Sequence, residues 1–265
     1  MTSAPSTPDD TTGGRGFRFT LRSLLLWTAG IAVLFCVFRM FLNAVQTAGR
    51  AAATAAAQCP LNQLLLALHN YHDAYGRFPP AFLADPDGKP MHSWRVLILP
   101  YVEEQALYDA YDFNEPWDGP NNSRLANRMP RTFLSPSEPP SSIYTNIVTL
   151  TGPGTAFPGS SSTMLDDFAD GTDNTILLAE ISRSTIPWLE PRDLDVGQMS
   201  FRVNDPDRPS ISCVWWRQPY VVFADCVTGF RLSDDIPPAA LRALTTIAGG
   251  EPVTRDGLLA EGHLE

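Results

Sequence analysis

The stretch LLLWTAGIAVLFCVF, residues 24–38, is an uncharged run of fifteen residues. Apolar residues continue beyond Arg39 to Leu42, so residues 23–42 would form a helix of roughly 30 Å if the Arg39 guanidinium reached the membrane surface. That length matches the hydrocarbon core of a bilayer. We therefore expect a transmembrane helix at residues 19–43, with the lipid bilayer contacted through residues 23–42. A helix buried in a protein core is the alternative, but such a helix seldom follows several arginines.

Arginines flank this run unevenly. Three of them precede it closely, namely Arg15, Arg18 and Arg22. Only Arg39 and Arg50 follow it at short range, so the positive-inside rule places the N-terminus in the cytoplasm. The expected location is the cytoplasmic (inner) membrane, crossed once, with the main domain periplasmic. Residues 1–14 are almost free of apolar side chains, and we expect residues 1–18 to form a disordered cytoplasmic tail.

Two kinds of processed N-terminus are alternatives to this anchor. Residues 51–57 contain several Ala-x-Ala triplets typical of signal peptidase sites, and Cys59 after Gln58 loosely resembles a lipoprotein site. Both lie well beyond the apolar run, whereas signal peptidases cut close behind it. The sequence therefore favours an uncleaved anchor.

The helix is expected to continue beyond the membrane to about Tyr75. Residues 44–70 are rich in Ala and Leu, which favour helix, although Pro60 should kink it. Four leucines follow the i, i+3, i+4, i+7 spacing of one helix face: Leu61, Leu64, Leu65 and Leu68. This stripe predicts packing on an apolar surface, for which a β-sheet is the favoured candidate. Gly76 should end the helix.

Beyond residue 76, short apolar runs alternate with clusters of Pro, Gly and Asn, a pattern typical of short strands and long loops. Candidate strands are residues 94–99, 143–150, 175–180, 214–216, 220–224 and 229–232. Residues 237–250 predict a final helix that begins after paired prolines and ends at paired glycines. The expected fold class is α+β, with one long N-terminal transmembrane helix packed on an antiparallel β-sheet with long loops. An extracytoplasmic domain spans residues 44–250, and residues 251–265 form a C-terminal tail.

Composition excludes several classes of protein. The formal net charge of −10 opposes contact with phosphates, so no nucleic-acid partner is expected. The mean hydropathy of −0.10 excludes a polytopic membrane protein. The sequence contains no G-x-S-x-G, P-loop, Rossmann glycine pattern or H-E-x-x-H, so we do not expect an enzyme. A hydrolase that uses carboxylates such as Asp170, Glu180 and Glu190 is the alternative, although their spacing does not favour it.

Carboxylates are concentrated around residues 166–174. Asp167, Asp170 and Asp173 are candidate calcium ligands, because several hard oxygen atoms in one loop suit this ion. The spacing is not that of an EF-hand, and the same residues are ordinary in a solvated turn, so both interpretations stay open. Residues 112–122 offer a weaker candidate of the same kind. No cofactor is expected, with calcium as the alternative.

Three further groups of residues are candidates for binding or cross-linking. His69 and His72 have a spacing that presents two imidazoles to one metal, but no further ligand follows in pattern, which favours structural roles. Cys213 and Cys226 flank a segment with the character of a hairpin, and an oxidising compartment would permit a disulfide between them. Aromatic residues suited to a sugar or peptide groove are Trp94, Tyr101, Tyr108, Tyr111, Trp117 and Trp188.

A family resemblance is carried by five segments, which are residues 59–81 (CPLNQLLLALHNYHDAYGRFPPA), 93–122 (SWRVLILPYVEEQALYDAYDFNEPWDGPNN), 170–180 (DGTDNTILLAE), 187–194 (PWLEPRDL) and 221–232 (VVFADCVTGFRL). In this order they closely resemble the planctomycete prepilin-like family of unknown function, which some classifications label solute-binding-like. One long N-terminal helix laid on an antiparallel sheet is also the plan of type IV pilins and type II secretion pseudopilins. The resemblance implies a pilin-like fold, and other pilin-like subunits or secretion components as partners.

The chain departs from the prepilin pattern at specific positions. Prepilins are cut between a glycine and a phenylalanine, here Gly16 and Phe17, and carry a glutamate five residues into the mature chain, where this sequence has Leu21. Ser135 stands where the family usually has a cysteine, so Cys59 lacks the partner that relatives offer. These departures favour an uncut anchor over filament entry.

The expected function is that of a single-pass, membrane-anchored, extracytoplasmic pilin-like protein with a structural or interaction role and an unknown molecular activity. The alternative is a surface protein that binds calcium, a glycan or a peptide. Calcium-dependent thermal stabilisation would favour this alternative.

Overall fold

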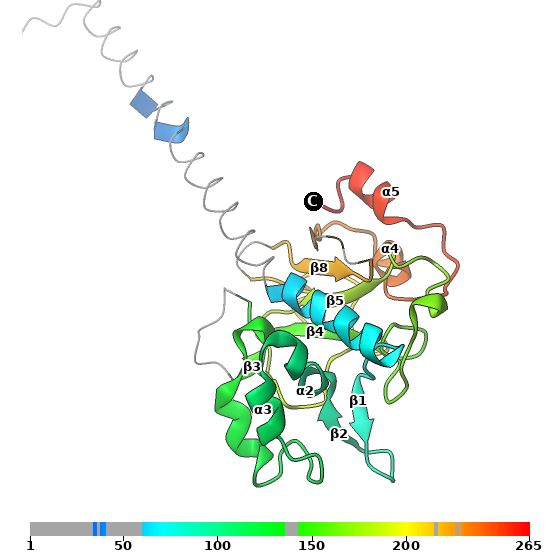
Figure 1. Ribbon diagram of the computed structural model, residues 1–265. Helices are drawn as coiled ribbons and strands as arrows, with labels where there is room; N and C mark the ends of the chain where they lie inside the picture. Colours follow the sequence, from blue (N-terminus) through cyan, green and yellow to red (C-terminus); the bar gives the residue numbers. More distant parts are fainter. Residues whose placement is uncertain are drawn as a thin grey trace, which may run out of the picture. The chain divides into compact units, whose positions relative to one another are not determined.

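The computed structural model describes residues 34–35, 38–40, 60–135, 143–214, 217–225, 227 and 229–265. The chain divides into two units, residues 1–49 and residues 50–265, and the second holds almost all the described residues. Figure 1 shows this second unit as a mixed α/β structure whose strands β4, β5 and β8 lie under a helix drawn in cyan.

The prediction of a fold with a long N-terminal transmembrane helix is wrong for the residues that the structure describes. None of the helices in the described ranges is both long enough and apolar enough to cross a membrane. The longest of them, at residues 60–75, has an apolar face toward the sheet and polar residues opposite, which is the pattern of a helix lying on a protein surface. The predicted span at residues 23–42 and the processing site at Gly16 and Phe17 lie outside the residues described above, apart from the few at 34–35 and 38–40.

The helix at residues 60–75 packs as its leucine stripe predicts. All four stripe leucines are buried in one hydrophobic cluster with residues of β5 and β8. Burying a leucine side chain contributes roughly 1.5–3 kcal/mol, so the stripe is a main attachment of this helix. The helix ends where the sequence predicts, because Gly76 adopts a left-handed φ of 71° and its N–H donates to the His72 carbonyl at 2.7 Å.

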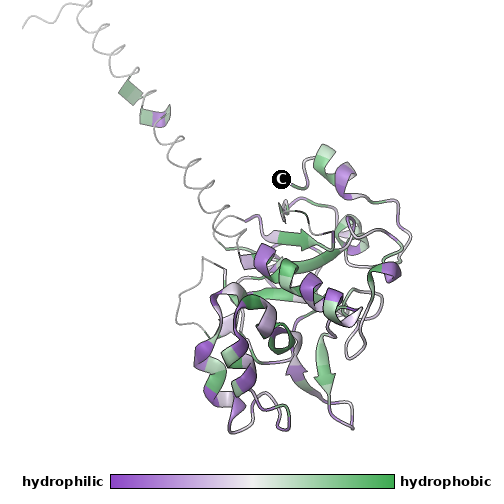
Figure 2. Cartoon of the chain, viewed as in Figure 1, coloured by the Kyte–Doolittle hydropathy of each residue, from purple (hydrophilic) through white to green (hydrophobic). Residues whose placement is uncertain are grey.

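The central sheet has the strand order β7-β4-β5-β8-β9. Its strands are β4 (Ile147–Thr151), β5 (Ile176–Glu180), β7 (Leu194–Asp195), β8 (Tyr220–Phe223) and β9 (Phe230–Arg231). All neighbouring pairs are antiparallel except β4 and β7, which run parallel. One face of the sheet contributes to the cluster under the helix and the other to a second cluster, so β5 and β8 are buried throughout. Figure 2 shows these two strands as mostly hydrophobic along their length.

Smaller elements surround the sheet. A hairpin is formed by β1 (Phe82–Ala84) and β2 (Pro90–Ser93), and a second pair by β3 (Tyr144–Thr145) and β6 (Ile186–Pro187). The helical pieces are α2 (Trp94–Leu97), η1 (Leu99–Val102), α3 (Gln105–Ala110), η2 (Asn122–Arg128), η3 (Arg131–Phe133), η4 (Leu165–Asp167), α4 (Pro238–Ala243) and α5 (Arg255–Ala260).

One predicted strand, residues 94–99, is helical instead. The Ser93 side chain accepts a hydrogen bond from the Arg95 N–H and caps α2, and Pro100 lies in the 3₁₀ helix η1 that follows. A short apolar run does not distinguish a buried strand from a buried helical turn, which is why the pattern misled. The strands predicted at residues 143–150, 175–180, 220–224 and 229–232 are confirmed in position, with shorter bounds.

The last residues pack against the sheet. The predicted helix at residues 237–250 is confirmed in part, as α4. Residues 251–265, expected to form a tail, contain α5 and a bridge between Leu264 and Leu232. The Arg255 guanidinium forms an ion pair with Asp225 and lies over the rings of Phe223 and Phe230.

Candidate functional site

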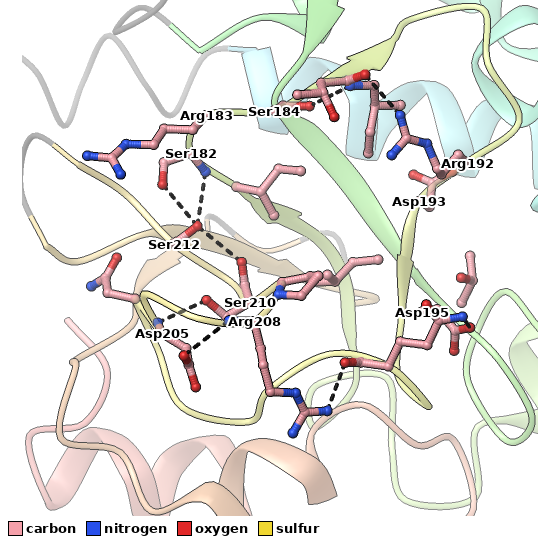
Figure 3. A pocket seen from close by; sticks show the side chains of 18 of the residues that line it. Ser182, Arg183, Ser184, Arg192, Asp193, Asp195, Asp205, Arg208, Ser210 and Ser212 are labelled. Carbon is pink, nitrogen blue, oxygen red and sulfur yellow. Dashed lines mark hydrogen bonds between the residues drawn. The ribbon is translucent and has the colours of Figure 1, made fainter.

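A cleft of about 880 Å³ opens beside the edge strand β7. Its walls come from the turn after β5 (residues 181–185), from residues 191–198 and from residues 204–217, while Phe82 of β1 closes one side. Figure 3 shows these segments surrounding the labelled polar side chains. Turns and an edge strand thus bring together residues that are far apart in the sequence.

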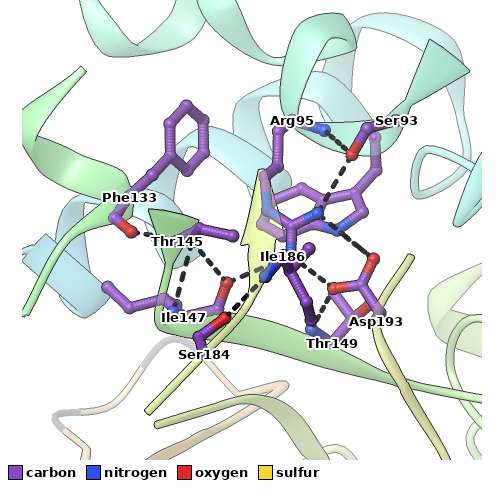
Figure 4. A network of polar contacts seen from close by, with 10 residues as sticks. Ser93, Arg95, Phe133, Thr145, Ile147, Thr149, Ser184, Ile186 and Asp193 are labelled. Carbon is purple, nitrogen blue, oxygen red and sulfur yellow. Dashed lines mark hydrogen bonds and ion pairs between the residues drawn. The ribbon is translucent and has the colours of Figure 1, made fainter. Parts of the chain in front are cut away.

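A buried ion pair fixes the floor of the cleft. The side chains of Arg95 and Asp193 are 0% and 1% exposed, and Arg95 Nη2 lies 2.6 Å from Asp193 Oδ1. Asp193 also accepts hydrogen bonds from Trp94 Nε1 at 3.1 Å and from the Thr149 N–H at 3.0 Å. Figure 4 shows Arg95 reaching Ser93 and the Ile147 carbonyl on its other sides. The pair therefore ties α2, β4 and the segment before β7 together.

Each charge of this pair is stabilised by the other. Burial raises the pKa of Asp193, and the Arg95 guanidinium, followed by the Thr149 N–H, opposes that rise. A buried charge without such partners would cost several kcal/mol. Both members are thus held by each other, so this pair is a structural element of the cleft rather than a reactive one.

Serine side chains brace one wall. The Ser182 N–H and hydroxyl both donate to Ser212 Oγ, at 3.0 and 3.1 Å, and the Ser212 hydroxyl donates to the Ser210 carbonyl. Ser210 Oγ in turn accepts from the Asp205 N–H at 3.1 Å. These bonds hold the turn after β5 against residues 204–212, as Figure 3 shows. The wall is therefore held by hydrogen bonds of serine side chains, to backbone groups and to each other, and not by a regular sheet.

Backbone conformations of an unusual kind are concentrated here. Among the described residues, four that are not glycine have positive φ, and three of these line the cleft, namely Arg183 (53°), Asn204 (55°) and Arg217 (57°). The left-handed region costs an L-residue roughly 1–2 kcal/mol. Asn204 offsets this cost by hydrogen bonds to the Arg217 carbonyl and from the Cys213 N–H. Local strain of this kind is often retained at binding sites.

The charged side chains of the cleft differ in how far they are paired. Arg192 binds Glu190 through two nitrogen atoms, and Arg217 binds Asp234 at 3.0 Å. Asp205 accepts from two backbone N–H groups, and hydrogen bonds from Ser200 and the Asp207 N–H lower its pKa.

The predicted calcium ligands are spread over separate contacts. Asp167 accepts from the Met164 N–H, and Asp170 accepts from the N–H groups of Gly249 and Gly250. Asp173 accepts from the Asn174 side chain. No group of three or more His, Cys, Asp or Glu side chains suited to a metal ion occurs among the residues that the structure covers. Calcium binding at these aspartates stays a prediction.

In the second acidic loop, the carboxylate of Glu115 caps the N–H groups of Asn121 and Asn122. The Asn122 side chain, which is fully buried, donates to the carbonyl groups of Asp112, Glu115 and Pro116. The polar groups of this loop thus bind one another.

The other sequence candidates have structural surroundings where they are described. His69 Nε2 lies 3.0 Å from the Ala224 carbonyl, and His72 packs on Phe78. Cys213 is buried beside the cleft, whereas Cys226 lies outside the described residues, so their disulfide stays a prediction. The proposed carboxylate set is not assembled around a common partner. Asp170 caps residues 249–250, Glu190 binds Arg192, and Glu180 is buried at the end of β5, where it accepts from the Tyr220 N–H.

The proposed aromatic groove does not form as a unit. Trp94, Tyr111 and Trp188 are core residues, at most 5% exposed. Tyr101 and Tyr108 are half-buried near Tyr71 and Tyr75 of the helix at residues 60–75.

A comparison with known protein families finds a match for part of the chain. Residues 47–164 match a family model described as a protein of unknown function (DUF1559). No curated protein and no solved structure matches the chain. The resemblance to an uncharacterised family is therefore confirmed at that level. The matched residues include the hairpin that closes the cleft, but most of the cleft walls lie after residue 164.

Sequence reasoning did not find the cleft. Its residues come from turns and loops that have no periodic pattern, and Arg95 and Asp193 are 98 positions apart. The available signal was the polar string around Ser182, Arg183 and Ser184, which closely follows a fully buried strand.

Proposed function

We propose that this chain is a binding protein and that its ligand or partner occupies the cleft beside β7. The observation that carries this proposal is the concentration of left-handed, non-glycine residues in a cleft whose floor is fixed by a buried ion pair. Maintaining such conformations costs folding free energy, and a binding role would account for their retention. This agrees with the structural or interaction role expected from the sequence, and the described residues of the cleft hold no assembled nucleophile and base.

The partners, the cellular location and the class of ligand are further proposals. The pilin-like resemblance proposes other pilin-like subunits or secretion components as partners, and the arginine distribution proposes a periplasmic main domain. Calcium, glycans and peptides remain candidate ligands, of which the cleft suits the last two by its size and its mixed apolar and polar walls.

The proposal is tested by filling the cleft. Thr185 is exposed and lines the cleft, so Thr185→Trp should block it without disturbing the core. Asn127→Trp on η2 is the matched control, because Asn127 is exposed and lies outside the cleft lining. A panel of glycans, peptides, amino acids and divalent ions is screened by thermal unfolding of the full chain. A ligand at about 100 times its Kd stabilises a protein by about 2.7 kcal/mol, which is several degrees in Tm for a chain of this size.

We expect a ligand that stabilises the wild type and Asn127→Trp but not Thr185→Trp. Binding that survives Thr185→Trp unchanged would place the site elsewhere and would refute the proposal.

A further inference from the structure

The hydrogen-bond acceptors of the cleft are already bonded within the protein, whereas some of its donors are not. All three carboxylates that line it already accept bonds from the protein. Asp193 has four such bonds, Asp195 accepts from the Gly197 N–H and the Gln198 amide, and Asp205 accepts from backbone N–H groups. A ligand that approaches the cleft therefore meets few acceptors that still need a donor.

Hydrogen bonds also connect the two outer carboxylates to the segment that holds Arg208. Arg208 donates to the carbonyl groups of Gln198 and Met199, and its own N–H donates to Asp205. Since Gln198 binds Asp195, these contacts place Arg208 between Asp195 and Asp205. Figure 3 shows Arg208 reaching toward the Asp195 side of the cleft.

The opposite end of the cleft has spare donors. Arg183 is the one arginine lining the cleft for which the described residues supply no hydrogen-bond acceptor. Ser184 Oγ accepts from the Ile186 N–H, which leaves its hydroxyl proton available, and the described residues give no partner to the Thr185 hydroxyl. At this same end Arg192 is already paired with Glu190, whereas the described residues supply no carboxylate partner to Arg183.

The backbone of Arg183 adds an independent observation. Its φ of 53° is one that glycine or asparagine adopts at lower cost, yet the position holds an arginine without a partner of its own among the described residues. A purely structural turn would gain stability from glycine here. The conformation of this turn therefore does not itself favour an arginine at this position.

From these contacts we infer that the 182–185 end of the cleft binds an oxyanion, held by the Arg183 guanidinium and the Ser184 and Thr185 hydroxyls. This rests on the proposed function and specifies the ligand as one with a carboxylate, sulfate or phosphate group. The guanidinium matches such groups in shape and charge, and hydroxyl donors complete the shell. The mixed apolar and polar remainder of the cleft accommodates the rest of the ligand.

The test uses the full chain and simple probes. Acetate, sulfate and phosphate are titrated at constant ionic strength, each against a neutral counterpart such as acetamide or dimethyl sulfone, and the backbone amide resonances of residues 182–185 are followed by NMR in the wild type and in each variant. Arg183→Gln should weaken oxyanion binding about tenfold, as expected for one charge-assisted hydrogen-bonded contact. Arg124→Gln is the matched control, because Arg124 is exposed on η2, outside the cleft. The three oxyanions together distinguish planar from tetrahedral ligands.

Arg183→Gly supplies a readout that separates binding from folding. We expect this variant to unfold at a higher temperature than the wild type, because the strained backbone is relieved, and to lose oxyanion binding. A lower unfolding temperature would show that the guanidinium supports the fold, and would overturn the inference. Equal binding of acetate and acetamide, blocked by Thr185→Trp, would also overturn it while leaving the proposed function intact. An adventitious salt effect would appear equally in the wild type and in Arg183→Gln, and would likewise overturn it.

Discussion

Replacing Asp193 alone should destabilise the protein more than replacing both members of its ion pair. In Asp193→Ala the Arg95 guanidinium stays buried, keeps its charge at every accessible pH and retains only Ser93 and the Ile147 carbonyl as acceptors. Breaking a buried pair in this way costs about 3–5 kcal/mol. That is a large share of the roughly 5–15 kcal/mol that stabilises a domain.

The double substitution Arg95→Met with Asp193→Leu removes both charges and fills similar volume. Replacing a buried pair by apolar residues is often neutral, so the double variant should lie within about 1–2 kcal/mol of the wild type. The coupling energy, measured with Arg95→Met alone and Asp193→Leu alone as the two single variants, should then be at least about 2 kcal/mol, which is measurable for residues in contact. Asp193→Asn, which keeps the shape, provides a milder variant if Asp193→Ala does not fold.

Arg95→Met differs from Asp193→Ala in its dependence on pH. Without the guanidinium, burial raises the pKa of Asp193 above its unfolded value, so the folded state takes up a proton more readily. The unfolding free energy of Arg95→Met should then fall as pH rises from the unfolded pKa through the folded pKa. Asp193→Ala has no carboxyl group at this position and should lack this fall.

The assay is urea unfolding of the full chain, followed by tryptophan fluorescence at several pH values. If Asp193→Ala cost less than about 1 kcal/mol, or if the two single losses simply added in the double variant, the pair would not be the fixed floor that we describe.

Three other substitutions test separate parts of the structure. Asn122→Ala removes a fully buried amide that bonds three carbonyl groups, and should lower the unfolding free energy by about 2–4 kcal/mol in urea titrations; a change below about 1 kcal/mol would contradict its role. Burial raises the pKa of Glu180, so the wild type should lose stability relative to Glu180→Gln as pH rises above about 4.3, and below that pH the difference should no longer change; a difference independent of pH throughout would be evidence against this. Arg255→Lys keeps the charge but loses the planar contact with two phenylalanine rings, so hydrogen exchange in α5 should be faster than in the wild type but slower than in Arg255→Ala; a rate in Arg255→Lys equal to that of the wild type would mean that the ring contacts contribute nothing.

The sequence predicts those parts of the fold whose contacts follow a regular period. The leucines from Leu61 to Leu68 repeat at helical spacing, and all four lie in the core as that spacing requires. Strands β5 and β8 are nearly continuous apolar runs between turn residues, which identifies them as strands buried on both faces.

The failures come from residues whose structure is decided at a distance. Residues 94–99 form helical turns because Ser93 caps them and because Arg95 must reach Asp193, a partner 98 positions away. The acidic segments looked like ion sites because carboxylates are close in sequence. In the fold Asp170 instead caps the N–H groups of residues 249–250, about 80 positions later. Single-chain patterns contain no information on such pairings.

The prediction of a long transmembrane helix also failed, because it used the properties of one segment alone. Length and hydropathy of the first fifty residues predicted it, but the helices of the described residues are short or amphipathic. The amphipathic helix at residues 60–75 is positioned by the sheet it covers, so its leucines report on that sheet and carry no information on a bilayer.

The buried pair and the cleft depend on each other. Strand β7 has two residues and pairs in parallel with β4, an arrangement too short to fix its own register. Asp193 immediately precedes β7, and its bond from the Thr149 N–H and its pairing with Arg95 set where that strand starts. Residues 194–198 form one wall of the cleft, so the position of this wall is determined by a charge pair in the core. An apolar replacement would preserve stability but would remove the directional contacts that set the register. This accounts for a buried ion pair at a position where hydrophobic residues would stabilise the domain equally well.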